Sequence, residues 1–426
     1  MEPARTQAGF ETLRAIGYAP YGGADIGEVV STAGRIPEGD EGAWYEQWRA
    51  LAERVGTAAD ASAATGRTVS AREAYLRSSN YYRLAEFYLR DDPDHDPRVL
   101  DTSRRSSAAF ARAAELLPQP LTRVQIPYQG TALPGWWVPA DPGTPDPRSH
   151  AAEGVTGAET SPEDPDGRRP VLLFHGGFDS TGEELYFASG AAAARRGYHA
   201  LLIEGPGQGS VLREQHLPFR PDWDVVVTAA VDWLLDHHVD GVDPDAIALM
   251  GMSMGGLLAP RAAAVEHRLA ALVAYDGVYS MPEAVDALLS APLKALVAQG
   301  APAADAQVDA ALATAMATDT QLRWTFLNGM WVLGVPTPVE LIRAFAPYTM
   351  ADSADQITCP TLVLDAENDL FFAGQAPKLR DALTAPTTYH LFHEADGAGE
   401  HCQDGAMTTL HQVTFDWLDA VLPAPR

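Results

Sequence analysis

The sequence has few cysteines and no long apolar run. Cys359 and Cys402 are its only cysteines in 426 residues, so it has neither a disulfide framework nor the CxxC spacing of many metal sites. We expect both to be free thiols. No stretch approaches the roughly 18 apolar residues of a membrane helix. The start, MEPARTQAGFETLR, lacks the apolar run of a signal peptide. We therefore expect a cytoplasmic protein with no membrane partner.

Basic residues are also scarce. Lys and Arg number 30 against 57 Asp and Glu, which gives a formal net charge of -27. Nucleic-acid binding needs a basic surface that this balance does not supply, so no nucleic-acid partner is expected. P-loop spacing is missing, and no GxGxxG opens a first βα unit, so nucleotide binding has little support. We expect no cofactor and no metal.

Two regions of different character precede the main part of the chain. Residues 1 to about 117 have apolar residues at three- and four-residue spacing, as in AREAYLRSSNYYRLAEFYLR, and predict an N-terminal helical domain. Residues 123–140 predict an antiparallel hairpin, because short β-type runs are broken there by Gly and Pro. Residues 141–169 are rich in Pro, Gly, Asp and Ser and predict a disordered insertion in a surface loop.

From Arg169 onward, buried β-type runs alternate with helical stretches. PVLLFHGG, YHALLIEGPGQG, DAIALMGMSMGG, LAALVAYDG, TCPTLVLDAEND and TTYHLFHEADG each include one strand. Such alternation predicts an α/β fold whose mostly parallel sheet carries helices on both faces, within a domain spanning 118–426. Residues 280–351 lack strand signals and are too long for an ordinary crossover. They predict a helical cap over one end of the sheet.

The strongest chemical signal is GMSMGG, residues 251–256, which lies between an apolar strand and a helix. In that context G-x-S-x-G predicts a nucleophile elbow, a tight turn that lifts Ser253 clear of the sheet. The alternative is a Gly-rich turn whose serine merely caps the following helix.

A serine nucleophile needs an orienting acid, which in this architecture lies between the serine and the base in chain order. Asp369 follows the strand TLVLDAEND and is our predicted acid. Asp365, nearer the strand, and Asp276, after the preceding strand, are the alternatives, while Glu367 is read as a turn residue. Asp369 could instead cap the helix that follows.

The general base is predicted to be His401. It follows the flexible GAGE turn and precedes the terminal helix, so a long loop could deliver it to Ser253. His390 and His393 lie in the strand TTYHLFHE, where a histidine is more often a sheet residue.

Two adjacent glycines end the strand PVLLFHGG. They serve as a simple turn, or they let backbone N–H groups approach a reacting oxygen closely. We favour an oxyanion hole in which Met254 donates one N–H group and Phe178 or Gly177 donates the second. EGPGQG, residues 204–209, is expected to form a second Gly-rich lip of the pocket.

Aromatic and sulfur-containing residues outside the sheet are candidates for a substrate pocket. At helical spacing such residues are more often core than pocket, so both interpretations stay open. The candidates are Tyr81, Tyr82, Trp324, Met330, Trp331 and Tyr348.

Together these motifs resemble the α/β-hydrolase superfamily over residues 120–426. RLAEFYL, GGFDSTGEE, WTFLNGMWVLGVPTP and CPTLVLDAENDLFF extend the resemblance over nearly the whole chain. They are similar to the group holding 2,6-dihydroxypseudooxynicotine hydrolase and the fungal polyketide chain-shortening hydrolases of naphthopyrone pigment synthesis. FrsA-like esterases are broader relatives.

This resemblance implies cleavage of a carbon–carbon bond next to a ketone by Ser253, Asp369 and His401. The implied substrate is a small aromatic or polyketide molecule, and a homodimer is left open. A carboxylesterase or an acyltransferase would use the same parts, and an inactive binding protein is the remaining class. Nothing in the sequence separates ketone from ester chemistry.

Overall fold

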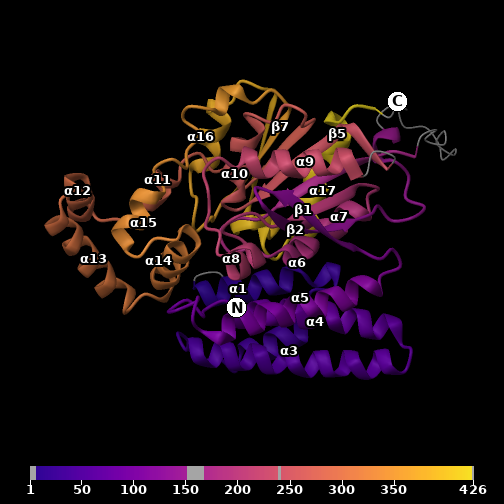
Figure 1. Ribbon diagram of the computed structural model, residues 1–426, viewed down its shortest axis with the longest axis horizontal. Helices are drawn as coiled ribbons and strands as arrows, with labels where there is room; N and C mark the ends of the chain where they lie inside the picture. The colour runs from indigo at the N-terminus through magenta and orange to yellow at the C-terminus, as the bar shows by residue number, and fades with distance from the viewer. Residues whose placement is uncertain (1–5, 151–166, 238–240, 425–426) are drawn as a thin grey trace.

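The computed structural model describes residues 6–150, 167–237 and 241–424. Its eight strands form one sheet in the order β1-β2-β4-β3-β5-β6-β7-β8 (Figure 1). β1 and β2 are antiparallel to their neighbours, and all other pairs are parallel. The expected α/β fold with a mostly parallel sheet is confirmed. The strands are β1 Thr122–Tyr128, β2 Thr131–Val138, β3 Arg169–His175, β4 His199–Ile203, β5 Val242–Met252, β6 Ala271–Tyr275, β7 Thr361–Ala366 and β8 Thr387–Phe392.

The first two strands form the hairpin that the sequence predicts. Gln129 and Gly130 join them with φ angles of 41° and 85°. Positive φ at both loop residues is the geometry that suits the right-handed twist of the flanking strands. The pair β1–β2 therefore extends the sheet at one edge through β4.

The central strands are buried because helices cover both faces of a parallel sheet. In β3, every residue from Pro170 to His175 is buried, and β6 is buried throughout. One π-helical turn, η4 Tyr186–Gly190, lies between the short helices α6 and α7. The α-helices of this part of the chain are α6 Gly182–Leu185, α7 Ala191–Ala194, α8 Gly209–Gln215, α9 Asp224–His237, α10 Gly255–Ala263, α16 Gln375–Ala382 and α17 Met407–Val421.

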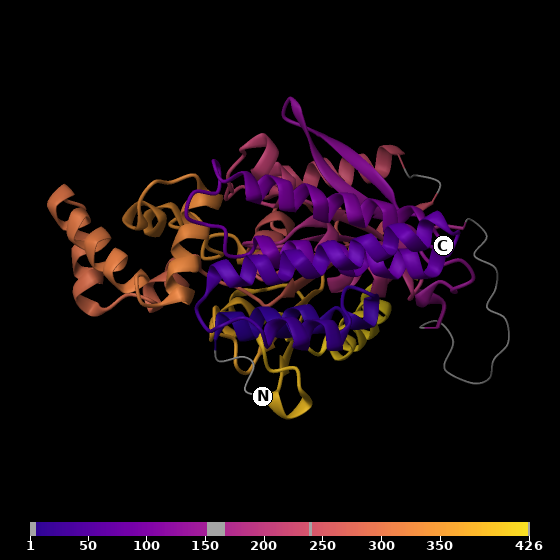
Figure 2. The ribbon, with the colours of Figure 1, turned by 90° about the horizontal axis from the view of Figure 1, so that it is seen from below.

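The N-terminal helices lie together as a layer against the strand-bearing part of the chain (Figures 1 and 2). No strand precedes β1 within the described residues. Arg14 of α1 reaches across to Glu184 of α6 at 2.8 Å, which ties the layer to the region around the sheet. The helices are α1 Gln7–Gly17, α2 Ile26–Ala33, α3 Glu41–Ala64, α4 Thr68–Glu86 and α5 Pro97–Glu115.

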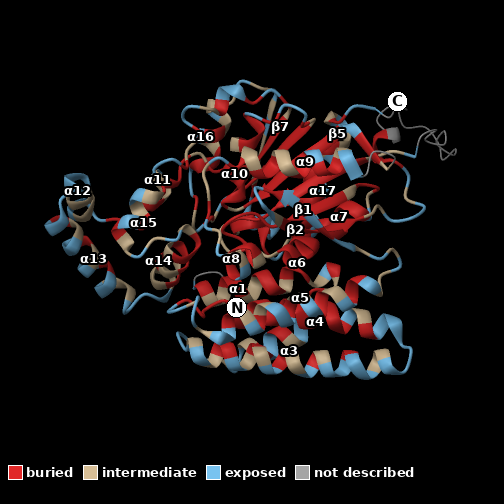
Figure 3. Cartoon of the chain, viewed as in Figure 1, coloured by how far each residue is buried: buried red, intermediate tan, exposed pale blue. Residues whose placement is uncertain are grey.

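Five α-helices lie between β6 and β7, in the stretch predicted to form a cap. α14 contacts the N-terminal layer, because Trp324 stacks on Phe87 and donates its indole N–H to the Phe87 carbonyl at 2.8 Å. By contrast, α12 and α13 project away from the sheet, and α12 has no buried residue (Figure 3). The five are α11 Met281–Ala287, α12 Ala291–Gln299, α13 Pro302–Met316, α14 Thr320–Leu333 and α15 Pro338–Ala344.

The structure bears on two further expectations only within its described residues. Most of the insertion predicted at 141–169 falls on 151–166, which lies outside the described residues. Among the helices that the structure does describe, none is long and apolar enough to cross a membrane.

Candidate active site

Ser253 stands on a sharp turn between β5 and α10. Its φ angle is 62°, and its N–H donates to the Tyr275 carbonyl at 2.9 Å. The turn requires small neighbours: a Cβ on Gly251 would lie 2.2 Å from the Gly255 carbonyl oxygen. A non-glycine residue held at positive φ is a strained arrangement typical of functional sites. The strand, turn and helix expected around Ser253 are therefore present.

Ser253, His401 and Asp369 form a chain of hydrogen bonds. His401 Nε2 lies 3.0 Å from Ser253 Oγ, and its Nδ1 lies 2.9 Å from Asp369 Oδ2. The other Asp369 oxygen accepts the N–H groups of Phe371 and Phe372 at 2.7 and 2.8 Å. These bonds fix the carboxylate, which leaves Nε2 of the imidazole free to accept the serine proton.

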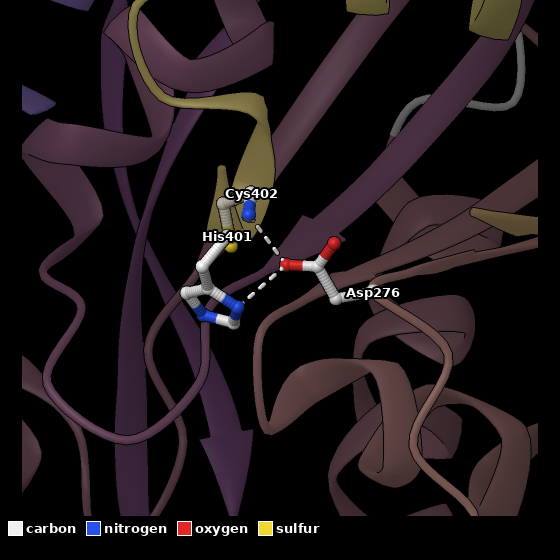
Figure 4. A group of neighbouring side chains, drawn as sticks. All are labelled: Asp276, His401 and Cys402. Carbon is white, nitrogen blue, oxygen red and sulfur yellow. Dashed lines mark hydrogen bonds and ion pairs between the residues drawn. The ribbon is translucent and has the colours of Figure 1, made fainter. Parts of the chain in front are cut away.

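A second carboxylate also faces the histidine. Asp276 Oδ2 lies 3.0 Å from His401 Nδ1 and accepts the N–H of Cys402 at 2.6 Å (Figure 4). Asp276 Oδ1 lies 3.4 Å from Gln403 Nε2. Cys402 and Gln403 have φ angles of 54° and 47°, so Asp276 holds an unusual backbone turn directly after His401. The structure thus brings both Asp369 and the alternative Asp276 to the same imidazole nitrogen.

The remaining acid and histidine candidates lie elsewhere. Asp365 accepts the hydroxyl of Tyr389 at 2.6 Å and does not contact His401. Glu367 accepts the N–H of Glu394 at 2.9 Å. His390 lies on β8 and packs against Phe392, as expected of a sheet residue. His393 follows β8 and contacts Glu367.

The carboxylates set the protonation of the site. Burial alone would lower the pKa of His401, but Asp369 and Asp276 outweigh it and raise that pKa well above its usual range. Burial would raise the pKa of Asp369, yet His401 and the N–H groups of Phe371 and Phe372 hold it below the ordinary value. The carboxylates therefore stabilise the imidazolium that forms when His401 takes up a proton.

Asp276, His401 and Cys402 also offer ligand atoms within 4.8 Å of one another (Figure 4). Carboxylate, imidazole and thiolate groups are all metal ligands in proteins. Here, however, His401 Nδ1 lies between two carboxylate oxygens and Nε2 lies near Ser253. A metal ion on Nδ1 would displace the proton that the carboxylates hold, so the geometry favours the hydrogen-bonded form.

The glycines after β3 lie against the elbow. A Cβ on Gly177 would lie 2.6 Å from the Met252 carbonyl oxygen and 2.7 Å from Met254 N. Since real Cβ atoms do not approach so closely, this position needs a glycine. Gly177 N–H donates to Ser180 Oγ at 3.2 Å. Of the two second donors considered, Phe178 is therefore the one whose N–H has no acceptor among the described residues.

EGPGQG supports this loop rather than forming a lip of the cavity. Gln208 Nε2 donates to the carbonyls of Gly176 at 2.7 Å and Gly177 at 3.2 Å. The buried His175 ring contacts the same Gly176 carbonyl at 2.9 Å, and burial lowers the His175 pKa to about 4. Neutral His175 and Gln208 thus position the glycine loop.

A cavity of about 340 Å³ opens beside Ser253 and His401. Met281 of α11, Trp324 of α14 and Leu341 of α15 line one side of it. Helix α1 forms part of the wall on another side, through Gln7, Phe10, Glu11 and Arg14, and Tyr18 directly after the helix lines the same side.

Of the predicted pocket residues, only Trp324 lines this cavity. Tyr81, Tyr82, Met330, Trp331 and Tyr348 pack elsewhere. Tyr81 is fully buried within the N-terminal layer and donates to Glu28 at 2.8 Å, and the indole N–H of Trp331 donates to Asp94 at 2.9 Å. Aromatics at helical spacing filled the core here, as the alternative interpretation held.

Sequence reasoning missed the α1 residues of the wall. The available signal was Glu11 and Arg14, two charges three residues apart between the apolar residues of QAGFETLRAIG. Buried charges in an amphipathic helix indicate either an ionic contact or a functional surface. Besides Glu11, the acidic partners of Arg14 are Asp179 and Glu184, which lie more than 160 positions away.

Known proteins that are similar to this chain are alpha/beta hydrolases, in agreement with the observed fold. The alpha/beta hydrolase family model matches residues 171–407. The chain is 34% identical to Hydrolase LUC6 of Fusarium sp, with 96% of this chain and 95% of LUC6 covered. It is 35% identical to 20-hydroxy-prefusarin hydrolase FUS2 of Gibberella moniliformis, with 98% and 97% covered.

The crystal structure of 2,6-dihydroxy-pseudo-oxynicotine hydrolase superposes with a TM-score of 0.70 at 23% identity, covering 96% of this chain and 98% of that one. The resemblance to this hydrolase and to fungal hydrolases is confirmed. With the family model spanning more than half of the chain and its relatives nearly all of it, the protein belongs to the alpha/beta hydrolase family and is a hydrolase.

Proposed function

We propose that the protein cleaves a carbon–carbon bond next to a ketone in an aromatic or polyketide-type substrate, with Ser253, His401 and Asp369 as a catalytic triad. The observation that carries the triad is the unbroken set of hydrogen bonds from Ser253 Oγ through His401 to Asp369, at 3.0 and 2.9 Å, beside a cavity. Carbon–carbon cleavage is supported by the resemblance in GGFDSTGEE, GMSMGG and the stretch WTFLNGMWVLGVPTP.

In this mechanism Ser253 Oγ attacks the ketone carbonyl while His401 Nε2 takes its proton. The N–H groups of Met254 and Phe178 hold the resulting oxyanion. As the tetrahedral adduct collapses, the carbon–carbon bond breaks and the electron pair leaves on an enolate or a phenol-stabilised carbanion. His401 returns its proton to that carbon. Water, activated by the same histidine, then hydrolyses the acyl-serine.

The leaving carbon needs an electron sink, because an unstabilised carbanion is far too basic to depart. A β-dicarbonyl group or an aryl ketone with a phenol supplies one. The apolar side chains of Phe10, Met281 and Leu341 around the cavity support this chemistry, since they limit competing protonation by water.

The helices around the cavity suggest roles for two further parts of the chain. We propose that residues 1–117 form a domain that covers the substrate and that residues 280–351 act as a cap. The positions of Phe10 on α1 and Trp324 on α14 in the cavity wall support these roles. Two buried free thiols, Cys359 and Cys402, agree with a cytoplasmic setting.

An ester could react with the same groups, so the decisive experiment compares leaving groups. Purified protein would be incubated with a β-dicarbonyl panel and a matched ester panel, with products identified by mass spectrometry and kcat/KM measured for each. We expect cleavage of ketones that carry the electron sink and slow turnover when it is reduced or methylated. Ser253→Ala is the control for non-enzymatic cleavage.

Two results would change the proposal. Turnover confined to esters would indicate a carboxylesterase, and transfer to an added alcohol or amine in preference to water would indicate an acyltransferase. Failure of a fluorophosphonate probe to label Ser253 in the folded protein would favour a binding protein.

A further inference from the structure

Phe178 carries the second N–H group of the proposed oxyanion hole, and the backbone on both sides of it is held by side-chain amides. Gln208 Nε2 donates to the Gly177 carbonyl at 3.2 Å, and Asn328 Nδ2 donates to the Phe178 carbonyl at 3.1 Å. The Gly177 carbonyl and the Phe178 N–H belong to one peptide group, and in a trans peptide they point in opposite directions. Together the two bonds therefore set the direction of the Phe178 N–H.

Asn328 lies on α14 and reaches Phe178 from outside the cavity. It is 1% exposed and is not among the described residues that line the cavity, so it cannot touch a substrate there. The Phe178 ring also packs against this part of the chain, with centroids 6.1 Å from Trp324 and 6.4 Å from Phe345. A Cβ on Gly329 would lie 3.2 Å from Phe178 Cζ. Both the carbonyl and the ring of Phe178 thus depend on the segment between β6 and β7.

Arg90 determines which way the Asn328 amide faces. Arg90 Nε donates to Asn328 Oδ1 at 2.8 Å, and Arg90 Nη1 donates to Glu86 Oε1 at 3.1 Å. A guanidinium only donates and a carbonyl oxygen only accepts, so exchanging the amide oxygen and nitrogen would break both contacts of Asn328. Arg90 follows α4 and is 4% exposed. The contacts therefore run from the N-terminal helices through α14 to the glycine loop after β3.

The contact with Phe178 is more than Asn328 needs to join α14 to the N-terminal helices. The bond to Arg90 alone would make that connection. An oxyanion donor, however, stabilises a developing charge only when it is already aimed at the oxygen, and a small misplacement is costly. Glycines at the start of the loop supply no side chains that could fix its backbone, so the support must come from neighbouring elements.

We propose that Asn328 is a positioning residue for the oxyanion hole: it holds the Phe178 peptide so that the Phe178 N–H faces the oxygen that becomes negative when Ser253 attacks. This inference rests on the proposed function, because the hole belongs to the same site. It applies equally to a ketone and to an ester, since both form an oxyanion. It also implies that the hole is complete only when α14 and the N-terminal helices are both in place.

Asn328→Asp tests this role with little change in size. The aspartate still accepts from Arg90, but a carboxylate oxygen replaces the donor and repels the Phe178 carbonyl. We expect kcat/KM for an activated aryl ester to fall by roughly 10- to 100-fold. Steady-state hydrolysis measures this loss.

A pair of inhibitors shows whether the loss arises at the oxyanion. With an aryl trifluoromethyl ketone, Ser253 Oγ adds to the carbonyl carbon, its proton passes to His401 Nε2, and the carbonyl electron pair stays on the oxygen as an oxyanion. The affinity of Asn328→Asp for this ketone should fall by about the same factor as kcat/KM. The corresponding trifluoromethyl carbinol forms no adduct, so its affinity should change by about twofold or less.

Asn80→Asp is the matched control. Asn80 lies on α4, is 1% exposed and makes the same kind of contacts, because Arg83 Nε donates to its Oδ1 at 3.2 Å and its Nδ2 donates to the Gly23 carbonyl at 2.9 Å. The same substitution should therefore lower the free energy of unfolding to a similar extent, as urea unfolding would measure. It should leave kcat/KM and both inhibitor affinities within about twofold of wild type.

Three results would overturn the proposal: unchanged kcat/KM in folded Asn328→Asp, equal losses of ketone and carbinol affinity, or the same kinetic loss in Asn80→Asp. If Asn328→Asp does not fold, Asn328→Ala removes the donor without adding a charge, and unchanged ketone affinity in it would also overturn the proposal. Failure of the proposed function has a different signature. Ester turnover that persisted in Ser253→Ala would contradict the triad, and a wild type inactive on β-dicarbonyl substrates would contradict carbon–carbon cleavage while the inhibitor comparison still stood.

Discussion

At the scale of single residues, two carboxylates approach the His401 imidazole, whereas a catalytic triad contains one. Asp369 and Asp276 approach its Nδ1 at 2.9 and 3.0 Å. Asp369 has its other oxygen fixed by two backbone N–H groups, whereas Asp276 also binds the N–H of Cys402. We infer that Asp369 orients the imidazole and that Asp276 chiefly positions the loop that carries it.

Substitution of the two acids separates these roles. Asp369→Asn should lower kcat by roughly 10²-fold or more, because the amide favours the wrong imidazole tautomer. Asp276→Asn should have a smaller effect, and the double variant should approach the roughly 10⁴-fold loss typical when the orienting acid is removed. Steady-state kinetics, with circular dichroism to check folding, would measure this. Full activity in Asp369→Asn and little in Asp276→Asn would reverse the assignment.

The same carboxylates govern the pH dependence. A general base must be neutral, so kcat/KM should rise as His401 loses its proton. Because the pKa of His401 is raised well above its ordinary value of about 6.5, this limb should lie above pH 6.5. Asp276→Asn should move the limb to lower pH, and Asp369→Asn should do so as well. A wild-type limb at or below pH 6.5 would contradict the electrostatic account.

The residues of the site that follow strand ends could be predicted from the sequence, and the contact that depends on an unusual backbone turn could not. Ser253, Asp369 and His401 follow strand ends, and parallel strands end at one edge of the sheet, so their placement and chain order together predicted their meeting. The second contact, by Asp276, depends on the left-handed backbone at Cys402 and Gln403, which the motifs do not reveal. No local pattern indicates that Asp276 and Asp369 share one nitrogen.

At the scale of elements, α1 lines the cavity and also joins the N-terminal helices to α6 through the ion pair of Arg14 with Glu184. The sequence predicted a helical N-terminal region but not which helix faces the cavity. That depends on contacts between Arg14 and Glu184, which are 170 positions apart. For the same reason Tyr81, a candidate pocket residue from its sequence, lies inside the helical layer instead.

Removal of the Arg14 ion pairs should destabilise the protein. Arg14→Leu would leave Glu184, Asp179 and Glu11 buried without their main counter-charge, a change that typically costs about 3–5 kcal/mol. Thermal or urea unfolding would measure the loss. Arg49→Leu is the control, because its ion pairs with Glu46 and Glu53 are solvent-exposed and contribute about 1 kcal/mol or less. Equal stability of the two variants would show that α1 docks through apolar contacts alone.

At the scale of the whole molecule, His411 connects three parts of the chain. It lies on α17, and its Nε2 contacts the Ala188 carbonyl of η4 at 2.6 Å. Its Nδ1 lies 2.7 Å from the hydroxyl of Tyr21, in the N-terminal region. With Nε2 as the donor, Nδ1 must be unprotonated to accept from Tyr21. Burial lowers the pKa of His411 to about 3, so acid should weaken this junction.

The pH dependence of stability should therefore change when His411 is replaced. Between about pH 3 and about 6.5 the unfolded chain binds a proton at this residue that the folded protein does not, so its contribution is lost as pH falls, at about 1.4 kcal/mol per pH unit. His411→Gln removes this titration while its amide can still donate to Ala188. Although less stable at pH 7, the variant should lose stability more gradually than wild type from pH 6 to 4. The raised pKa values of Glu11 and Asp404 act in the opposite direction but are common to both proteins, so they cancel in the comparison. His95→Gln is the control, since the His95 side chain is 81% exposed. Urea unfolding at each pH would give the free energy of unfolding of both proteins. If this free energy changed with pH equally in wild type and His411→Gln, His411 would not be the proton-linked contact between Tyr21 and η4.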